Sequence, residues 1–415
     1  MPFAGFVAEL QHAYGAEAAS ARHEIFFIAQ RTSWLGPRPR ALLAAVRDAL
    51  LCLMANSTSV SAAVVMIASR PGPSGIDALQ PFMADLDRRG ILYDIAVHPR
   101  LRRAVSGASG PGRPPWSAWM HACRAFVLTF EKPDWRAFVV RCCLFRLRLW
   151  QGAWSRTLGA QRGGALVLHN DFELFCVAAL LAGGTRWHGV CVQHGLPTDE
   201  FFPTRAPRQI VWGESSRRAY LDKGTPPAVL RYGPHTQIVT RQDRPLAQAI
   251  GLVSQTHTPV FGRALSADFL DIAERIAARF AGRELAIHLH PEEVRLGHPY
   301  TSERLAVLCR RPPHAEFGGD TGPSKILVGF CSTALIQAAQ NGHLVIGMNW
   351  PVTASRQALS VGRPEIVADD ADQLCDLVDR LLADPAARAD MLERQRSWLA
   401  RSFAHGDDWL PEIPA

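Results

Sequence analysis

Polar side chains that could carry out chemistry, with one glycine and one proline among them, stand where five apolar, strand-like runs of this 415-residue sequence end. In the first half of the chain these residues are His169, Asn170, Asp171, Glu173, Gln193, His194 and Gly195. In the second half they are Ser254, Gln255, His257, His288, His290, Pro291, Glu292, Ser332 and Thr333. Imidazoles and carboxylates transfer protons, and hydroxyls at a helix start suit a phosphate group. Because the carboxyl ends of parallel strands share one edge of a sheet, we expect these residues to line a common cleft.

Several of these residues also have ordinary structural explanations. Asp171 precedes FELFCVAAL and could cap that helix, and Ser332 and Thr333 could cap the helix that ALIQAAQ predicts. The sequence around the histidines of HLH has no recognised metal-site spacing, so we expect no metal there. The motifs GxSxG, HExxH and GxxxxGK are absent, which argues against hydrolase, metalloprotease and P-loop chemistry.

The elements that position these residues alternate between short apolar runs and amphipathic segments. The predicted strands of the first part are residues 23–30, 62–69, 91–98, 165–171, 189–195 and 209–214. A second alternation follows the polar stretch at 240–245, with strands at 250–257, 284–291, 325–333 and 344–350. This pattern predicts doubly wound parallel sheets in two α/β domains, 1–240 and 241–370. Residues 371–415 predict helices that pack back across the domains.

Composition narrows the class of protein. The chain is 48% hydrophobic and 20% charged, and its 45 basic residues against 38 acidic ones form no recognised nucleic-acid-binding motif. The nine cysteines include no CxxC pair, and the first residues do not resemble a signal peptide, so we expect a cytoplasmic protein with buried thiols. The basic, tryptophan-containing segment 134–158 predicts either a long helix packed across the first domain or an interfacial membrane helix.

The order of the motifs resembles that of bacterial surface-polysaccharide glycosyltransferases of the HP-motif type. The motifs are QHG followed by a proline, then VWGE, RYGPH, a strand ending in HP, and GFCSTAL before an alanine-rich helix. That family includes polysialyltransferases, other sialyltransferases and Kdo-transferase relatives, and the likeness spans residues 165–350. A more distant likeness is to the glycerophosphotransferases of teichoic acid synthesis. The acidic pair followed by glycine of the sialyltransferases is absent, and HNDFE stands in its place.

The resemblance implies an α/β, GT-B-like fold with two doubly wound domains facing a central cleft, and a CMP-activated sugar as donor. In such enzymes the HP histidine and the paired hydroxyls hold the nucleotide phosphate, here His290, Ser332 and Thr333. We therefore expect Ser254, Gln255, Pro291 and Glu292 on the donor side as well. The acidic residue of the chemistry would be Asp171, acting as base or as nucleophile, with His194 as an alternative base. His169, Asn170, Glu173, Gln193 and Gly195 would line the acceptor side.

These observations predict a metal-free, cofactor-free glycosyltransferase that moves an acidic sugar such as Kdo or sialic acid. The acceptor would be a capsule or lipopolysaccharide saccharide, with peripheral inner-membrane contact and no nucleic-acid partner. Two alternatives remain open from the sequence. One is a polyol-phosphate transferase with a CDP-linked donor, and the other is a catalytically inactive nucleotide-binding assembly subunit.

Overall fold

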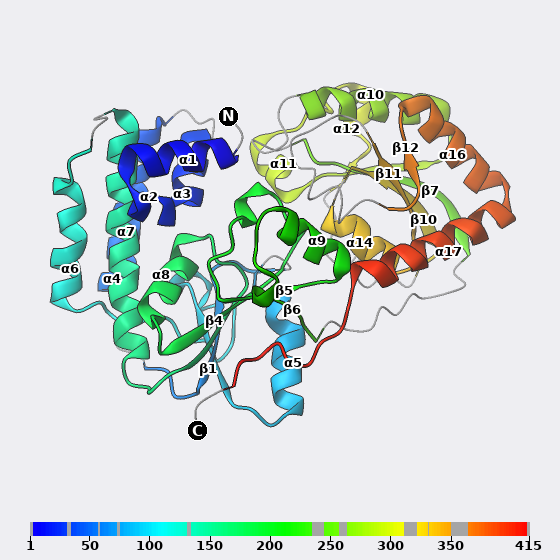
Figure 1. Cartoon of the computed structure of the whole chain (residues 1–415). Helices are drawn as coiled ribbons and strands as arrows, with labels where there is room; N and C mark the ends of the chain where they lie inside the picture. The colour runs from blue at the N-terminus through cyan, green and yellow to red at the C-terminus, as the bar shows by residue number, and fades with distance from the viewer. Residues whose placement is uncertain are drawn as a thin grey trace.

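The fold consists of two six-stranded sheets, each with helices on its faces (Figure 1). The computed structural model describes residues 3–30, 35–56, 59–72, 75–130, 134–234, 245–256, 264–310, 322–330, 332–349 and 364–412. The first sheet has the order β2-β1-β3-β4-β5-β6 and the second the order β12-β11-β10-β7-β8-β9. All strand pairs in both sheets are parallel. The strand and helix alternation therefore predicted the class of fold correctly.

The strands of the first sheet are β1 (Val64–Ala68), β2 (Tyr93–Val97), β3 (Gly164–Leu168), β4 (Trp187–Val192), β5 (Arg208–Val211) and β6 (Leu230–Tyr232). Those of the second are β7 (Leu246–Val253), β8 (Glu284–His288), β9 (Cys309–Arg310), β10 (Ser324–Gly329), β11 (Leu344–Met348) and β12 (Val367–Ala368). In both sheets the strand order reverses beside the first strand, between β1 and β3 and between β7 and β10. Ligands of doubly wound folds bind at the carboxyl ends of the strands that flank such a switch point.

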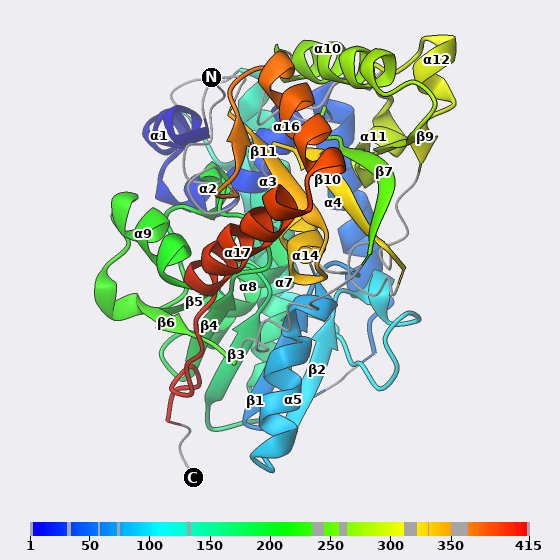
Figure 2. The same ribbon diagram turned by 90° about the vertical axis from the view of Figure 1, so that its right-hand side faces the viewer.

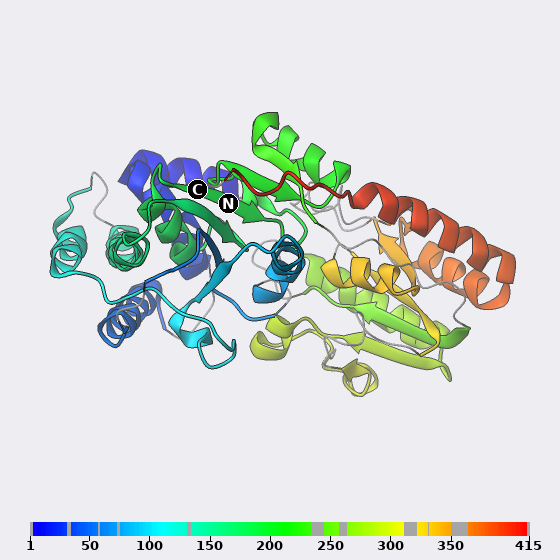
Figure 3. The same cartoon turned by 90° about the horizontal axis from the view of Figure 1, so that it is seen from below.

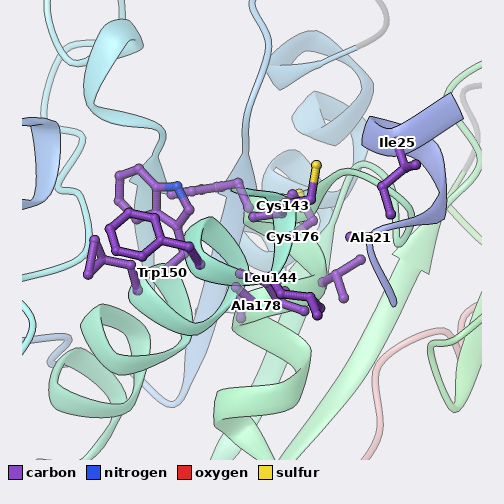
Figure 4. Close-up of a cluster of buried hydrophobic side chains, with 14 of the residues drawn as sticks. Ala21, Ile25, Cys143, Leu144, Trp150, Cys176 and Ala178 are labelled. Carbon is purple, nitrogen blue, oxygen red and sulfur yellow. The ribbon is translucent and has the colours of Figure 1, made fainter. Parts of the chain in front are cut away.

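The first domain carries an additional layer of helices around α7 (Trp135–Leu158), which packs against α4 (Pro37–Leu53), α6 (Trp116–Cys123) and α8 (Leu174–Gly183). Figure 4 shows Trp150, Leu144 and Cys143 of α7 beside Cys176 and Ala178 of α8. Sixteen of the 24 residues of α7 are buried. The interfacial membrane helix considered for this segment is therefore wrong, and the packed helix is confirmed.

The basic residues of α7 are explained by ion pairs inside the first domain. Arg146 Nε lies 2.8 Å from Asp48 Oδ2 of α4, and its Nη1 lies 3.1 Å from Glu24 Oε2. Arg148 Nη2 lies 2.7 Å from Glu17 Oε2. Burying an arginine is tolerated only when the charge is paired and hydrogen-bonded, as it is here. No helix of the described residues is both long enough and apolar enough to cross a membrane.

The predicted strand at residues 23–30 is wrong, because that segment is the helix α3 (Arg22–Gln30). It follows two further helices that the sequence did not indicate, α1 (Phe3–Tyr14) and α2 (Ala16–Ser20). Short apolar runs do not distinguish a strand from a buried helix. Here the helix buries Ile25 and Phe26 on one side while Glu24 reaches Arg146. The short strand β6 was also missed.

The second domain is covered by α10 (Ala264–Arg279), α11 (Pro291–Leu296), α12 (Glu303–Ala306), α14 (Thr333–Gln340), α16 (Ala371–Ala383) and α17 (Pro385–Ser402). Helix α17 contacts α14, β11 and also α9 (Glu214–Asp222) of the first domain. Beyond α17 the chain returns along the first domain (Figure 2). Phe403 stacks on Trp212 with ring centroids 5.6 Å apart, and Trp409 Nε1 donates to Asp85 Oδ2 at 2.7 Å. These contacts tie the two domains together.

Candidate functional site

A buried polar cluster lies at the switch point of the first sheet, where β1 and β3 end. We call Ser69, Arg70, His169, Asn170 and Glu173 the first-sheet cluster. Glu173 pairs with Arg70 and accepts a hydrogen bond from Ser69 Oγ. Asn170 Nδ2 lies 2.7 Å from His169 Nε2, while its Oδ1 accepts from the backbone N–H of Glu173 at 2.9 Å. The predicted residues His169, Asn170 and Glu173 are thus in one network.

The hydrogen bonds assign the protonation states of this cluster. His169 Nδ1 lies 3.4 Å from the carbonyl of Ile67 and donates to it, so Nε2 accepts from Asn170. Burial lowers the pKa of His169 to about 4, which keeps the imidazole neutral. Burial alone would raise the pKa of Glu173, but the charge of Arg70 and the hydrogen bond from Ser69 hold it at about 2. The cluster therefore contains one ionised carboxylate beside one guanidinium.

His194 follows β4 and lies against aromatic rings of the same domain. Its ring stacks on Phe201 at a centroid distance of 5.1 Å and lies 5.7 Å from the ring of His169 and 5.9 Å from that of Phe172. The Nδ1 atom is buried and has no hydrogen-bond partner among the described residues. Burial lowers the pKa of His194 to about 3. The imidazole is therefore neutral, and its buried Nδ1 has no partner among the described residues.

Gln193 fixes the turn that presents His194. Its Oε1 accepts from the backbone N–H of Trp212 at 3.0 Å, and its Nε2 donates to the carbonyl of Gly195 at 3.0 Å. The indole of Trp212 donates in turn to the carbonyl of Gln193 at 2.9 Å. Both ends of this side chain amide are thus used inside the first domain. Gln193, which we expected to line the cleft, positions the loop instead.

Asp171 is the residue on which the sequence placed the acid–base chemistry, and its surroundings favour a different role. The carboxylate is buried, and its Oδ2 accepts from Thr204 Oγ1 at 2.7 Å, from the backbone N–H of Arg205 and from that of Ala206 at 3.1 Å. Three donors on one oxygen are typical of a carboxylate that holds a loop. The N-cap of α8 is Glu173, whose side chain makes no cap hydrogen bond, so the alternative of a capping Asp171 is wrong.

The switch point of the second sheet is held by a buried glutamate that the sequence did not single out. Glu293 Oε1 accepts from Ser254 Oγ at 2.7 Å, from the backbone N–H of Thr256 at 2.6 Å and from the Thr256 hydroxyl. Its Oε2 accepts from the backbone N–H of His290 at 2.6 Å. Ser254 Oγ also lies 2.6 Å from the hydroxyl of Tyr300. We call these five residues the second-sheet clamp, and it fixes His290 where β8 gives way to α11.

The other residues predicted for the donor side are placed as follows. Gln255 is buried beside Ser254, and Pro291 begins α11. Glu292 lies in α11 with its side chain outside the described residues, as does His257 as a whole. His288 is the last residue of β8 and is buried. Its ring packs against Gly251 of the neighbouring strand β7, where an added Cβ would lie 2.8 Å from Nε2. Burial lowers the pKa of His288 to about 4.

The hydroxyl pair begins α14 as predicted, and one of its members faces the first domain. Ser332 is the N-cap, and its Oγ accepts from the backbone N–H of Ala334 at 3.2 Å. A Cβ on Gly195 would lie 3.6 Å from Thr333 Oγ1. The loop after β4 and the N-terminus of α14 are therefore in close approach. A Cβ at this position would make only an ordinary van der Waals contact, so the approach does not itself require a glycine.

The residues that sequence reasoning missed had recognisable signals. Ser69 and Arg70 come directly after β1, as His169 comes directly after β3. The expectation that polar residues at strand ends line the site therefore applied to them equally. Glu293 stands three residues after His290, which is the spacing of a capping box. The partners Thr204 and Arg205 of Asp171 had no such signal, because they lie more than 30 residues away in an irregular loop. Among the described residues no group of His, Cys, Asp and Glu could hold a metal ion.

Comparisons with known proteins bear on the fold. No protein-family model matches the chain, and no curated protein matches it. The crystal structure of the glycotransferase of kitacinnamycin superimposes with a TM-score of 0.50 and 14% identity, over 82% of this chain and 95% of that one. A putative UDP-N-acetylglucosamine 2-epimerase from Listeria monocytogenes gives a TM-score of 0.48 and 13% identity, over 80% of this chain and 91% of that one. Anabaena HepE in complex with UDP and glucose gives a TM-score of 0.43 and 11% identity, over 82% of this chain and 95% of that one.

At such low identity the first of these likenesses establishes the fold and nothing finer. Together with the two parallel sheets, it confirms the predicted GT-B-like class, in which two doubly wound α/β domains are joined in one chain. This is the fold of a glycosyltransferase. The membership in the HP-motif family and the CMP-linked donor stay predictions.

Proposed function

We propose that this protein transfers a sugar from a nucleotide-activated donor, held by the second domain, to a saccharide acceptor held by the first. The approach of Gly195 to Thr333 carries the proposal. It brings the end of β4 to the N-terminus of α14, next to the switch points of both sheets. Ligands of this class of fold bind at such positions. Sugar transfer is the function in which each of the two domains would hold one substrate.

On the donor side, the N-terminus of α14 would receive the phosphate. The hydroxyls of Ser332 and Thr333 would donate to an anion, and the helix dipole favours negative charge there. His290, fixed through its backbone by Glu293, would face the same phosphate. These donors stabilise the charge that develops on a leaving nucleotide phosphate without a metal ion. The order of the HP and hydroxyl motifs favours CMP as that nucleotide.

On the acceptor side, His194 is our assignment for the base, in preference to Asp171. A neutral imidazole with an unpartnered Nδ1 can accept the proton of an acceptor hydroxyl as that oxygen bonds to the anomeric carbon. The bond to the nucleotide phosphate breaks in the same step and CMP leaves with its electron pair. A phosphate nearby would raise the low pKa of His194, because a negative charge favours the protonated ring. Donor binding would thus make His194 a stronger base.

The test is turnover with a panel of donors, followed by mass spectrometry of the products. We expect transfer from CMP-activated Kdo or sialic acid. The variant His194→Ala should lower turnover at least about 100-fold while CMP binding, measured by calorimetry, is retained. His188→Ala, an exposed histidine on the same strand β4, is the matched control and should behave as the wild type.

Other outcomes of this experiment discriminate between the alternatives. Turnover of CDP-glycerol alone would assign the protein to polyol-phosphate transfer. Binding of CMP without turnover of any donor would make it a nucleotide-binding assembly subunit. Equal turnover by His194→Ala and His188→Ala would remove His194 from the chemistry.

A further inference from the structure

The outer helices of the first domain expose an apolar surface that the fold itself does not use. Of the 13 large hydrophobic side chains that are exposed among the described residues, ten lie on α4, α6 and the turns that follow them. On and after α4 they are Leu42, Leu43, Val46, Leu50, Leu53 and Met54. On and after α6 they are Trp116, Met120, Phe126 and Val127. We call these ten residues the outer apolar face.

Helical spacing shows that each group forms a stripe. Residues 42, 46, 50 and 53 recur at intervals of three or four and so lie on one side of α4, as do 116 and 120 on α6, while Phe126 and Val127 belong to the short 3-10 helix that follows α6. The opposite side of α4 is buried at Ala41, Ala45, Asp48 and Cys52. A helix that is apolar on both sides is normally buried on both sides. The exposed apolar side of α4 therefore has no packing partner among the described residues.

The two stripes belong to one layer, because α4 and α6 both pack against α7. Figures 1 and 3 show this layer on the side of the first domain that lies away from the second domain. The outer apolar face is consequently separate from the region where Gly195 meets Thr333. Trp116 is 75% exposed and Met54 is 71% exposed, values that are unusual for such large apolar side chains.

The exposed charged residues of the two helical segments themselves are basic. Arg38, Arg113 and Arg124 are exposed on or next to the two helices, and no carboxylate of the described residues lies within ion-pair distance of them. Residues 36–56 contain a single acidic residue, Asp48, and residues 112–130 contain none. Asp48 is 1% exposed and is paired with arginines. Tryptophan and leucine flanked by arginine are typical of a surface that rests on anionic lipid headgroups.

We propose that the outer apolar face docks the first domain on a bilayer that contains anionic phospholipid. The apolar stripes enter the boundary between headgroups and acyl chains, while the flanking arginines contact lipid phosphates. Two antiparallel or parallel copies of this chain would instead bring arginines of like charge together at the rim, which disfavours self-association. The proposal does not depend on the sugar-transfer chemistry, because it concerns a different surface.

The test is co-sedimentation of the full chain with vesicles of phosphatidylcholine alone and of phosphatidylcholine mixed with phosphatidylglycerol. We expect the mixed vesicles to bind at least about tenfold more tightly, and high salt to weaken that binding. Leu50→Glu and Trp116→Glu should each weaken it by about tenfold or more, since a charge opposes entry into the apolar layer. Arg38→Gln and Arg124→Gln should each weaken it by about fivefold.

Val307→Glu is the matched control, because Val307 is 64% exposed but lies on the second domain. It should bind vesicles as the wild type does. Circular dichroism and thermal unfolding of each variant establish that the exposed substitutions leave the fold intact. The proposal is overturned if the wild type binds neither vesicle, or if Val307→Glu loses as much binding as Leu50→Glu. It is also overturned if light scattering shows a stable dimer that Leu50→Glu dissociates, because a second copy then covers the face.

Discussion

Each domain buries a glutamate just beyond a strand that ends near the switch point, and the two glutamates have different partners. Glu173 follows Asn170 by three residues, and Glu293 follows His290 by three. A capping box has two reciprocal hydrogen bonds between residues three apart. In the former, the side chain of the first residue accepts from the backbone N–H of the later one; in the latter, the side chain of the later residue accepts from the backbone N–H of the first. The first domain makes only a bond of the former type, Asn170 Oδ1 with Glu173 N–H, and it closes the turn before α8, whose N-cap is Glu173. The second makes the latter, Glu293 Oε2 with His290 N–H.

This difference separates a carboxylate that responds to a ligand from one that fixes geometry. Glu173 is the N-cap residue of α8 but its side chain makes no cap hydrogen bond, so its oxygens reach Ser69 and Arg70, and Arg70 is itself 48% exposed. A half-exposed guanidinium can exchange its partner for a ligand anion. Glu293 is fully buried, and its described donors are hydroxyls and backbone N–H groups. We therefore expect Glu293 to govern stability and Glu173 to govern the site.

Removal of the second-sheet carboxylate should have the largest effect. Glu293→Ala leaves the donors of Ser254, Thr256 and His290 without their acceptor, so the free energy of unfolding should fall by about 3–5 kcal/mol. Urea denaturation measures this change. Glu284→Ala, an exposed glutamate at the start of β8, is the control and should change stability by less than about 0.5 kcal/mol. A loss below 1 kcal/mol for Glu293→Ala, on the order of a surface change, would contradict the clamp.

Removal of the charge on the first-sheet carboxylate should cost less. Glu173→Gln keeps the shape of the side chain and leaves Arg70 able to turn toward water, so we expect a loss of about 1–2 kcal/mol. Glu393→Gln, in an exposed pair with Arg396, is the control for an ion pair with little net value. If Glu173→Gln proved as destabilising as Glu293→Ala, the distinction between the two glutamates would fail.

The buried histidines of the first domain should make stability depend on pH. Burial lowers the pKa of His23 and of His169 to about 4, below the ordinary value near 6.5. Between these values the unfolded chain binds more protons than the folded one, so the free energy of unfolding falls as pH is lowered from about 6.5 to about 4. The contribution of each residue is about 1–3 kcal/mol. Denaturation at a series of pH values measures the slope.

The variant His23→Phe should flatten that slope. The ring of His23 already packs against Phe27 and Phe172, and its Nδ1 has no partner among the described residues, so phenylalanine fits its surroundings. His188→Phe, at an exposed position of β4, is the control. Glu173, with its pKa held at about 2, loses its stabilisation as pH falls from its ordinary value near 4.5 toward 2, so it adds to the slope only at the acidic end of this window. An unchanged slope for His23→Phe would contradict the assignment.

The smallest effect is expected where the two domains meet. Gly195→Ala adds a methyl group 3.6 Å from Thr333 Oγ1, an ordinary contact, so stability should change by less than about 0.5 kcal/mol. Gly195→Leu should keep the fold but lower donor turnover, since the larger side chain fills the space beside Thr333. Gly164→Ala provides the contrast within the same domain, because its Cβ would collide with the carbonyl of Ala63. It should destabilise by about 2 kcal/mol or more.

The sequence predicted most of the fold because its signals are local. Apolar runs of four to eight residues between amphipathic segments identified nearly all long strands, and their alternation gave parallel sheets. It also placed polar residues correctly at strand ends, and Ser332 and Thr333 at the start of a helix. The one long misassignment, α3, occurred where an apolar run was compatible with either structure.

Only the tertiary structure decided which of those polar side chains form hydrogen bonds or ion pairs, and with which partners. Asp171, Asn170 and Glu173 lie within four residues of one another, yet one holds the loop at 204–206, one closes the turn before α8 and one pairs with Arg70. The partners of Asp171 and Glu173 come from loops more than 30 and more than 100 residues away, and nothing in the local sequence encodes such a choice. The same holds for Glu293, whose role depends on residues 254–256 of another strand. Side chain partners are set by the packing of distant segments, whereas strand and helix formation is set by near neighbours.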